Sequence, residues 1–443
     1  MVLSSFFKWI KVSDNEYAIF NTLIMDVLYV QKKELIHILN AEFDKLDLKL
    51  LKQACIVVED NEMDEKALDC LKYQFSMNSK KIAIMYLIVS SGCNLGCRYC
   101  FIDNNENNNS FEMNMSLDVL EEAVHKYLAY IEAKKIEKPQ ILFYGGEPLL
   151  NFKAIKYAVE IVNASEIHVD YCIVTNGTLL TDEVARFLAE NNFSIGISLD
   201  GPKDINDFNR IFRQSSASVY DNVCKSVSLL KKYNANFGLS LTVSEYFLKH
   251  KDDIFSWLKE FGVKNIFYNL FHYTYYEPEE VWRRYYENAS NYLIKSHEVL
   301  SVYGVVDGRL NRKIESIVEN KFKFADCAAI GANQVTIKPN GDVCVCHGYL
   351  KTDKYVIGNI RDKDFDFFAN SEEFEFWKER STLYNDKCLS CEALFACGGG
   401  CPTQAEALYG SRKLVDEPFC IHTKKTLKWL LECGAQSSLE DES

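Results

Sequence analysis

Cys93, Cys97 and Cys100 are the residues of this chain whose spacing most clearly indicates chemistry. They form a Cys-x3-Cys-x2-Cys motif between Ser90 and Phe101. Thiolates bind metal ions, and a structural zinc ion prefers four protein ligands. No fourth cysteine or histidine lies nearby in the sequence, so the motif favours a centre with an open coordination position, such as a 4Fe-4S cluster with one iron free for substrate. A zinc site completed by a distant ligand is the alternative.

A second set of cysteines lies in the last third of the chain. Of the 16 cysteines in total, most fall in these two regions. A long chain without a recognisable signal peptide keeps its cysteines reduced, so clustering indicates metal ligation rather than disulfides. The clustered residues are Cys327, Cys344, Cys346, Cys388, Cys391, Cys397, Cys401 and Cys420. We expect the isolated cysteines to be core or surface residues: Cys55, Cys70, Cys172, Cys224 and Cys433.

Apolar runs and amphipathic patterns alternate from residue 82 onward. The runs predict strands at 82–89, 141–144, 169–174, 194–199, 237–243 and 265–271. The patterns predict helices at 117–133, 152–162, 182–190, 220–233 and 252–261. Buried strands separated by helices pair in parallel through right-handed crossovers, so we expect an α/β fold, an open or partial (βα)6 barrel. The first cysteine motif then follows the first strand, at the carboxyl edge where ligand sites gather.

Further motifs follow the next strands in order. Tyr144-Gly145-Gly146-Glu147-Pro148 ends the second strand, Thr175-Asn176-Gly177 the third, and Ser198-Leu199-Asp200-Gly201-Pro202 the fourth. Together with the cysteine motif they resemble the radical S-adenosylmethionine (SAM) enzymes, over about residues 86–273. In that family the open iron binds the amine and carboxylate of SAM, and one electron cleaves SAM to a 5'-deoxyadenosyl radical.

The resemblance implies a set of SAM contacts. Gly145 and Gly146 allow close backbone approach, and Glu147 can accept a hydrogen bond from the methionyl ammonium. Asn176 belongs to the third-strand motif, and Ser198 with Asp200 can bind hydroxyls or the carboxylate. Arg210 and Arg213 are further candidates for the carboxylate. Phe101 and the backbone of Tyr99 would face the adenine.

The second cysteine set is similar to the seven-cysteine SPASM extension of radical SAM enzymes that modify peptides and proteins. The resemblance implies two auxiliary 4Fe-4S clusters, three clusters in all. By analogy the outer cluster is held by Cys388, Cys391, Cys397 and Cys420, and the inner cluster by Cys327, Cys346 and Cys401. Cys344 could supply a fourth inner ligand, or it is a small hydrophobic residue. If it is the latter, one inner iron is open to a substrate thiolate. Two zinc sites are the alternative.

The remaining elements define the other parts of the chain. At the N-terminus, strands at 16–20 and 23–30 turning at Asn21-Thr22, helices at 32–39, 46–53 and 64–75, and a strand at 55–59 suggest a winged-helix-like unit. Asn340-Gly341 predicts a hairpin between strands at 334–338 and 342–346. We divide the chain into residues 1–80 (winged-helix-like), 81–278 (partial barrel), 279–326 (helical bridge), 327–436 (SPASM domain) and 437–443 (disordered tail).

Composition and charge exclude several classes of protein. Hydrophobic residues make up 48% and charged residues 26%, as in ordinary folded proteins. Lys and Arg number 50 against 63 Asp and Glu, and the net charge of -13 argues against a nucleic-acid-binding surface. No segment approaches the ~18 consecutive apolar residues that span a bilayer. We therefore expect a cytoplasmic protein without a nucleic-acid or membrane partner.

The residue after Cys346 bears on the substrate. Sulfatase maturases of this family typically have Asp there as a base, whereas this chain has His347. For His347 itself we favour the role of a histidine packed near the cluster. The stretch Cys346-His347-Gly348-Tyr349-Leu350, continuing to Ile357-Gly358-Asn359-Ile360, looks more like the maturases that install thioether links in cysteine-rich ribosomal peptides.

We therefore predict a radical SAM maturase that abstracts hydrogen from a Cys-containing ribosomal precursor peptide and forms a thioether. Its electrons would come from a flavodoxin or ferredoxin-type donor. Residues 1–80 would bind a leader peptide as an added strand at residues 23–30, or would be a dimerisation or packing appendage. The alternatives are a sulfatase-type maturase that makes formylglycine and a non-catalytic zinc-binding peptide-recognition protein. The sequence identifies no catalytic base.

Overall fold

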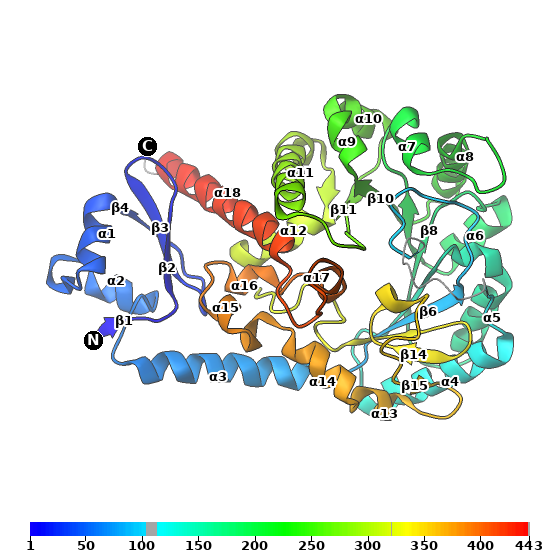
Figure 1. The fold of residues 1–443 in the computed structure, drawn as a ribbon, viewed down its shortest axis with the longest axis horizontal. Coiled ribbons are helices and arrows are strands. Elements are labelled where there is room, and N and C mark those ends of the chain that lie inside the picture. The colour runs from blue at the N-terminus through cyan, green and yellow to red at the C-terminus, as the bar shows by residue number, and fades with distance from the viewer. Residues whose placement is uncertain (103–112, 320, 442–443) are drawn as a thin grey trace.

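The protein is built around one large sheet with helices on its outer face (Figure 1). The structure, a computed structural model, describes residues 1–102, 113–319 and 321–441. Six parallel strands form the centre of the sheet: β6 (Ile84–Ser90), β7 (Gln140–Gly145), β8 (Asp170–Thr175), β9 (Ser194–Ser198), β10 (Phe237–Val243) and β11 (Asn265–Leu270). The predicted parallel strands are therefore confirmed, each within two residues at either end.

Helices connect successive strands, as predicted. They are α4 (Leu117–Lys134), α5 (Phe152–Asn163), α6 (Asp182–Glu190), α7 (Lys203–Asn209), α8 (Val219–Lys232), α9 (Glu245–Lys249) and α10 (Ile254–Phe261). Local sequence sets their ends: the Thr181 hydroxyl accepts a hydrogen bond from Val184 N at the start of α6, and Gly262 adopts φ 71° after α10. The short helices α7 and α9 were not predicted.

The sheet continues beyond the six central strands on both sides. β12 (Val306–Asp307) pairs with β11, and β13 (Gln334–Ile337) pairs in parallel with β6. β13 also forms the predicted hairpin with β14 (Asp342–Cys344), which pairs with β15 (Gly358–Asn359). The C-terminal unit is thus joined to the barrel by backbone hydrogen bonds, and β6 is paired on both edges.

The bridge and the C-terminal part are helical. Their helices are α11 (Glu279–Leu300), α12 (Gly308–Val318), α13 (Phe365–Ala369), α14 (Glu372–Glu379), α15 (Asp386–Leu389), α16 (Leu394–Cys397), α17 (Pro402–Tyr409) and α18 (Glu417–Asp441). α18 extends to Asp441, into the segment from residue 437 for which a disordered tail is predicted. Leu431 and Ala435 are buried just before it, so packing holds the preceding turns of the helix. Residues 442–443 lie outside the described residues.

Short 3-10 helices complete the connections. They lie at Phe43–Lys45, Pro148–Asn151, Lys251–Asp253, Ser301–Tyr303, His347–Tyr349 and Thr382–Tyr384. Two of them stand at the carboxyl ends of strands next to the predicted site motifs, after Glu147 and after Cys346.

The N-terminal unit contains a three-stranded antiparallel sheet and three helices. Its elements are β1 (Val2–Leu3), β2 (Phe7–Lys11), β3 (Glu16–Asn21), β4 (Leu28–Gln31), β5 (Val57–Val58), α1 (Lys32–Leu39), α2 (Leu48–Gln53) and α3 (Asn61–Asn78). β2 was missed, and the predicted strand at 23–30 is correct only in its last part. Leu23 and Met25 are buried in a loop rather than in a strand, and the positive φ of Met25 (60°) is incompatible with extended pairing.

Both faces of this small sheet are covered. α1 and α2 pack on one face through Leu35, Ile38 and Leu51. The other face contacts α18 at Leu427 and Leu431. In Figure 1 the unit lies at one end of the molecule beside both termini, and α3 connects it to the barrel. Only the edges of the sheet, β2 and β4, have no further strand beside them among the described residues.

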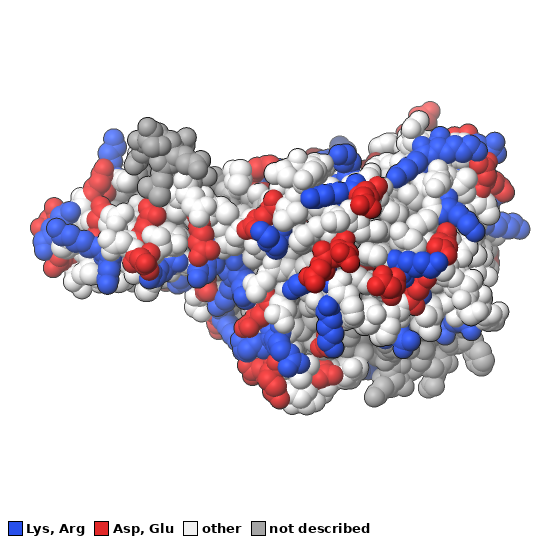
Figure 2. Space-filling model, turned by 90° about the horizontal axis from the view of Figure 1, so that it is seen from above, with Lys and Arg blue, Asp and Glu red and all other residues white. Residues whose placement is uncertain are grey.

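The charges on the surface and the apolar character of the helices agree with what the composition predicts. On the face shown in Figure 2, basic and acidic side chains are interspersed, and no continuous basic track crosses it. Among the described helices, none combines the length and the apolar character that a bilayer-spanning segment requires.

Candidate functional site

The first cysteine motif follows β6 directly, and the two glycines after β7 hold it there. Gly146 N donates to Ser90 O (3.1 Å) and Glu147 N donates to Gly92 O (2.8 Å). A Cβ on Gly145 would lie 2.1 Å from Ser90 O, and one on Gly146 would lie 2.1 Å from Gly92 O. The close approach that these glycines permit is therefore to the loop carrying Cys93.

Glu147 ties the ends of β7 and β8 together. Its fully buried carboxylate accepts hydrogen bonds from Thr175 Oγ1 (2.6 Å), Leu149 N (3.0 Å) and Asn176 N (2.7 Å). Burial nevertheless raises the pKa of Glu147 to about 7. A carboxylate offers about four acceptor sites, so these donors leave capacity for an ammonium group.

Asp200 and Arg210 form a buried ion pair behind the cysteine loop. Arg210 Nε and Nη2 each donate to the Asp200 carboxylate at 3.0 Å, and Thr242 N donates to it at 2.9 Å. Tyr99 Oη donates to the same carboxylate at 2.5 Å, and Arg210 lies 5.4 Å from the centre of the Tyr99 ring. Asp200 is thus directed at chain groups rather than at the site, which differs from its expected role. Ser198, at the end of β9, is half-buried.

Hydrogen bonds from neighbouring loops fix the cysteine loop. Asn176 Nδ2 donates to Asn94 Oδ1 (2.9 Å) and lies 3.8 Å from Cys93 Sγ, and Arg213 Nε donates to Cys93 O (3.1 Å). Burial raises the pKa of the Cys93 thiol to about 12 and that of Cys97 to about 11. Because metals bind the thiolate, loading this site would release protons. Through its hydrogen bond to Cys93 O, Arg213 stabilises the loop that carries Cys93.

Aromatic rings fill the space between this loop and the second cysteine set. The Phe101 ring lies 5.7 Å from the His272 ring and 6.1 Å from the His347 ring. His347 also stacks on Tyr86 at 4.8 Å and contacts Tyr144 at the same distance. We call these five side chains the ring cluster. It brings barrel residues and a SPASM residue together in the interior of the molecule.

His272 is a site residue that sequence reasoning missed. Its Nε2 lies 3.3 Å from Cys401 Sγ and 3.0 Å from Thr403 Oγ1. Burial lowers the pKa of His272 and lowers that of His347 to about 4, so both rings are neutral. In each ring the buried Nδ1 has no hydrogen-bond partner among the described residues. Such atoms are rare in folded proteins and are expected where a bound molecule completes the site.

The three predicted inner-site cysteines come together beside the ring cluster. Cys327 and Cys401 each raise the pKa of the Cys346 thiol, after the larger effect of burial. Burial also raises the pKa of Cys327 to about 12, although this residue has accessible surface.

Cys344 contacts the backbone of Cys346 and is enclosed by the protein core. It is fully buried, and its thiol donates to the backbone carbonyl of Cys346 at 3.4 Å. β14 ends at Cys344, so the strand alternation that would turn both side chains the same way stops before Cys346. This geometry favours the interpretation of Cys344 as a core residue.

The four predicted outer-site cysteines line one cavity. Cys388, Cys391, Cys397 and Cys420 surround a space of about 230 Å³. A single zinc ion would draw four thiolates to ~2.3 Å from itself and leave no such space, whereas a cluster of iron and sulfide ions would occupy it. In residues 1–102, 113–319 and 321–441, no three His, Cys, Asp or Glu side chains lie close enough together to hold a single metal ion. The donor set and the cavity fit a 4Fe-4S cluster.

Comparisons with known proteins agree with this geometry. Residues 87–243 match the Radical SAM superfamily, and residues 327–392 match SPASM, an iron-sulfur cluster-binding domain. The cysteine-type anaerobic sulfatase-maturating enzyme of Clostridium novyi is 28% identical over 74% of this chain and 89% of its own length. The radical SAM cyclopropyl synthase TigE of Paramaledivibacter caminithermalis is 25% identical over 98% of this chain and 96% of its own.

Solved structures share the fold. The anaerobic sulfatase-maturating enzyme anSMEcpe with bound AdoMet superposes with a TM-score of 0.67 at 24% identity, covering 79% of this chain and 97% of that chain. Streptococcus suis SuiB bound to its precursor peptide SuiA superposes with a TM-score of 0.56 at 16% identity, covering 95% of this chain and 99% of that chain.

Fold and site together define a radical SAM enzyme, which uses SAM and iron-sulfur clusters. With the SPASM domain at its C-terminus, the chain belongs to the radical SAM/SPASM family.

Proposed function

We propose that this enzyme modifies a Cys-containing ribosomal precursor peptide and forms a thioether cross-link. The observation that carries the proposal is the ring cluster, which connects the loop of Cys100 to the inner-site cysteines within a few side chains. A peptide bound against these rings would meet both the SAM site and the inner site. A carbon atom and a cysteine sulfur of one substrate could then be held close together.

Ten cysteines would hold three 4Fe-4S clusters in this proposal. Cys93, Cys97 and Cys100 would hold the SAM-binding cluster, Cys327, Cys346 and Cys401 the inner one, and Cys388, Cys391, Cys397 and Cys420 the outer one. When bound, these cofactors supply a 5'-deoxyadenosyl radical that removes a hydrogen atom, and an acceptor for the electron released on bond formation. The product would be lighter by two hydrogens. A flavodoxin or ferredoxin-type protein would supply electrons.

The chain's own residues would bind SAM and orient it. Glu147 has the acceptor capacity for the methionyl ammonium of SAM, and Asn176 stands beside Cys93. Arg210 is fixed by Asp200 and Tyr99, and it carries a positive charge close to the cysteine loop. Phe101, together with Gly145, Gly146 and Ser198, would complete the SAM contacts. No side chain among the described residues is assigned as a base.

The N-terminal unit would recognise the leader peptide. TigE and SuiB align with 98% and 95% of this chain, whereas the sulfatase maturase of Clostridium novyi aligns with 74%. The faces of the three-stranded sheet are covered, so an added peptide strand has only the edges β2 and β4 to pair with. β4 begins at Leu28, so the proposed pairing edge is Leu28–Gln31 rather than residues 23–30.

Similarity to known relatives provides two other candidate products. Similarity to TigE over nearly the whole chain favours a carbon–carbon ring closure as the second candidate. Formylglycine formation is the third, by similarity to the sulfatase maturases. His347 stands where those enzymes typically have Asp, which weighs against it.

One anaerobic reaction separates these products. The reconstituted enzyme is incubated with SAM, reductant and a Cys-containing precursor peptide encoded beside its gene, and the peptide is alkylated at thiols before mass spectrometry. A loss of two hydrogens with one alkylation site fewer supports the thioether. The same mass loss with every thiol still alkylated refutes it in favour of carbon–carbon closure, and an aldehyde-reactive product favours formylglycine.

Leader recognition has its own measurement. Hydrogen exchange in β4 should slow when the leader segment alone is added, because an added strand protects the edge amides. Unchanged exchange at both β2 and β4 would contradict the proposal. Deleting residues 1–80 is a poorer test, because it uncovers Phe395, Leu427 and Leu431.

A further inference from the structure

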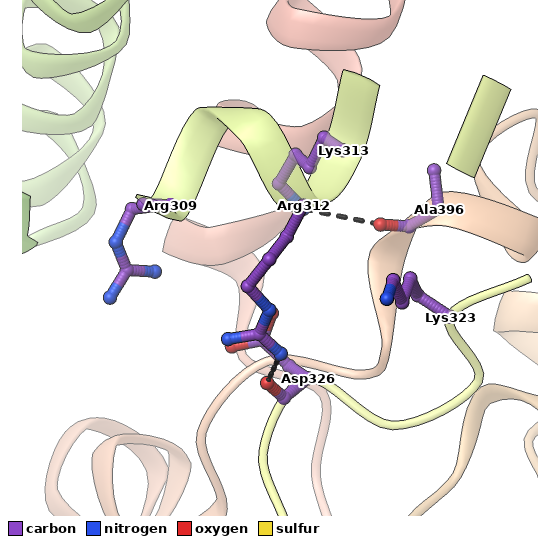
Figure 3. Close-up of a pocket in the computed structure, with 6 residues that line it drawn as sticks. All are labelled: Arg309, Arg312, Lys313, Lys323, Asp326 and Ala396. Atoms are coloured by element: carbon purple, nitrogen blue, oxygen red, sulfur yellow. Dashed lines mark hydrogen bonds between the residues drawn. The ribbon is translucent and has the colours of Figure 1, made fainter. Parts of the chain in front are cut away.

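Two consecutive basic residues of α12 donate hydrogen bonds to backbone carbonyls next to the two sets of auxiliary cysteines. Arg312 donates to the backbone carbonyl of Asp326, the residue before Cys327 of the inner site. Lys313 Nζ donates to the backbone carbonyl of Ala396 (3.2 Å), the residue before an outer-site cysteine. Figure 3 shows both bonds. One turn of one helix thus reaches the two auxiliary sites with two cations.

Lys313 differs from the other basic residues of this group because its side chain is buried and forms no ion pair within 4.0 Å among the described residues. It is 5% exposed, and its other contacts are the Thr423 hydroxyl (3.1 Å) and the Phe419 ring, whose centre lies 4.9 Å away. No carboxylate of the described residues lies within 4.0 Å of its Nζ. Lys323, in the same group, is 29% exposed and lies 3.9 Å from the Glu315 carboxylate.

A buried ammonium group is costly unless an opposite charge compensates it. The neighbours of Lys313 indicate where that charge would be. Ala396 and Phe419 each directly precede an outer-site cysteine, and Thr423 is close enough to Cys397 to lower the pKa of its thiol. The Asp326 carboxylate and, after it, the Cys397 sulfur are close enough to favour the charged form of Lys313. An iron-sulfur core with four thiolate ligands carries a net negative charge, so a loaded outer site would add a stronger negative charge on the Cys397 side.

We propose that Lys313 is the buried counter-charge of the outer auxiliary cluster and raises that cluster's reduction potential. The inference rests on the proposed assignment of the four outer-site cysteines. Reduction adds one electron to the cluster from an external low-potential reductant, and no bond is made or broken. A fixed cation in a poorly solvated position stabilises the added negative charge, and net charge and hydrogen bonding set the potential of such clusters. Lys313 acts on the cluster indirectly, as a positioning residue. It acts through its hydrogen bond with Thr423 and through the electric field of its ammonium group.

The test is a redox titration of the anaerobically reconstituted full-length enzyme, followed by electron paramagnetic resonance. In Lys313→Gln, which keeps a donor but removes the charge, the ratio of reduced to oxidised outer cluster at a fixed potential should fall about tenfold, equivalent to about 59 mV for one electron. Lys323→Gln removes a charge from the same group at a more solvated position, and it should change the ratio less than twofold. Lys313→Arg should keep the wild-type value. The other two clusters should titrate as in the wild type.

Thr423→Val provides a second, nearly isosteric variant. It removes the hydroxyl between Lys313 and the Cys397 sulfur, so it should lower the reduced fraction in the same direction but less. If Lys313→Gln does not assemble the outer cluster, this variant decides. Wild-type potentials in every variant that assembles the cluster would overturn the inference.

The failure of the inference can be told apart from that of the proposed function. Unchanged potentials with a modified peptide would remove only the role of Lys313. A wild-type enzyme without iron at the outer site, shown by identical iron content in a Cys388→Ala variant, would overturn the cluster assignment and the inference with it. A peptide left unmodified while the potentials shift as expected would refute only the proposed substrate.

Discussion

Glu147 should make the stability of the SAM-free enzyme depend on pH in a direction opposite to that of most carboxylates. Its side chain is completely buried at the junction of β7 and β8, and burial raises its pKa to about 7 from an ordinary value of 4.5. The folded chain therefore holds the carboxyl proton more tightly than the unfolded chain does. Glu147→Gln removes this titration while keeping the shape of the side chain.

The size of the effect follows from the two pKa values. A group with a raised folded-state pKa contributes stability that is fully present below the unfolded pKa and is lost as the pH rises through the folded pKa. The difference of about 2.5 pKa units corresponds to about 3 kcal/mol over the whole window from pH 4.5 to above pH 7. About 1.4 kcal/mol of this falls between pH 6 and pH 8.5, where iron-sulfur clusters persist.

Urea unfolding of the SAM-free, reconstituted enzyme at several pH values measures the effect. The wild-type midpoint should fall relative to that of Glu147→Gln as the pH rises from 6 to 8.5. The difference between the two proteins cancels the other titrating groups, such as the buried histidines. Glu183→Gln, an exposed carboxylate on α6, should give a profile parallel to the wild type. Parallel profiles for Glu147→Gln as well would refute the reasoning.

Three further predictions concern the cysteine sites and their support. Replacing Cys93, Cys97 and Cys100 together with Ala should remove one cluster and abolish 5'-deoxyadenosine formation; retained formation would contradict their role. Gly146→Ala should lower SAM cleavage at least tenfold and destabilise the fold by about 2–3 kcal/mol, because its Cβ would meet Gly92 O at 2.1 Å and break two loop hydrogen bonds; wild-type urea midpoints would contradict this. Cys344→Ala should leave the iron content unchanged, and a loss of iron would make Cys344 a ligand.

The sequence predicts the barrel well because its signals are local. β10 and α6 occur at the residues expected from apolar runs and helical periodicity. The strand at 23–30 was overextended, because an apolar run shows burial but not the positive φ of Met25 that ends pairing. β12, at Val306–Asp307, is too short to leave a pattern and exists because it pairs with β11.

The same contrast holds for the site. Cys93, Cys97 and Cys100 form a motif that is continuous in sequence, so their spacing alone predicts one cluster site. The inner and outer cysteines interleave along the chain, and only the resemblance to the SPASM extension divides them into two sites. His272 and Cys401 are 129 residues apart and meet only in the folded chain, so no spacing could connect them. The sequence also could not assign Asp200, since nothing local shows that Arg210 and Tyr99 would bind its carboxylate. Sequence patterns do not show which buried side chains will contact one another in the folded chain.

The segment between the two auxiliary sites explains how one short stretch of chain can serve both. Cys397 of the outer site and Cys401 of the inner site are separated only by Gly398, Gly399 and Gly400, all at positive φ. A Cβ on Gly398 would lie 2.2 Å from Asp326 N, so only glycine lets this turn pack beside the inner site. The inner site then faces the ring cluster, while the outer cavity is lined by the partly exposed Lys387 and Lys424. If the proposed clusters are bound, this order from the first cysteine loop through the ring cluster to the outer cavity would give an electron released by the substrate a direct path outward.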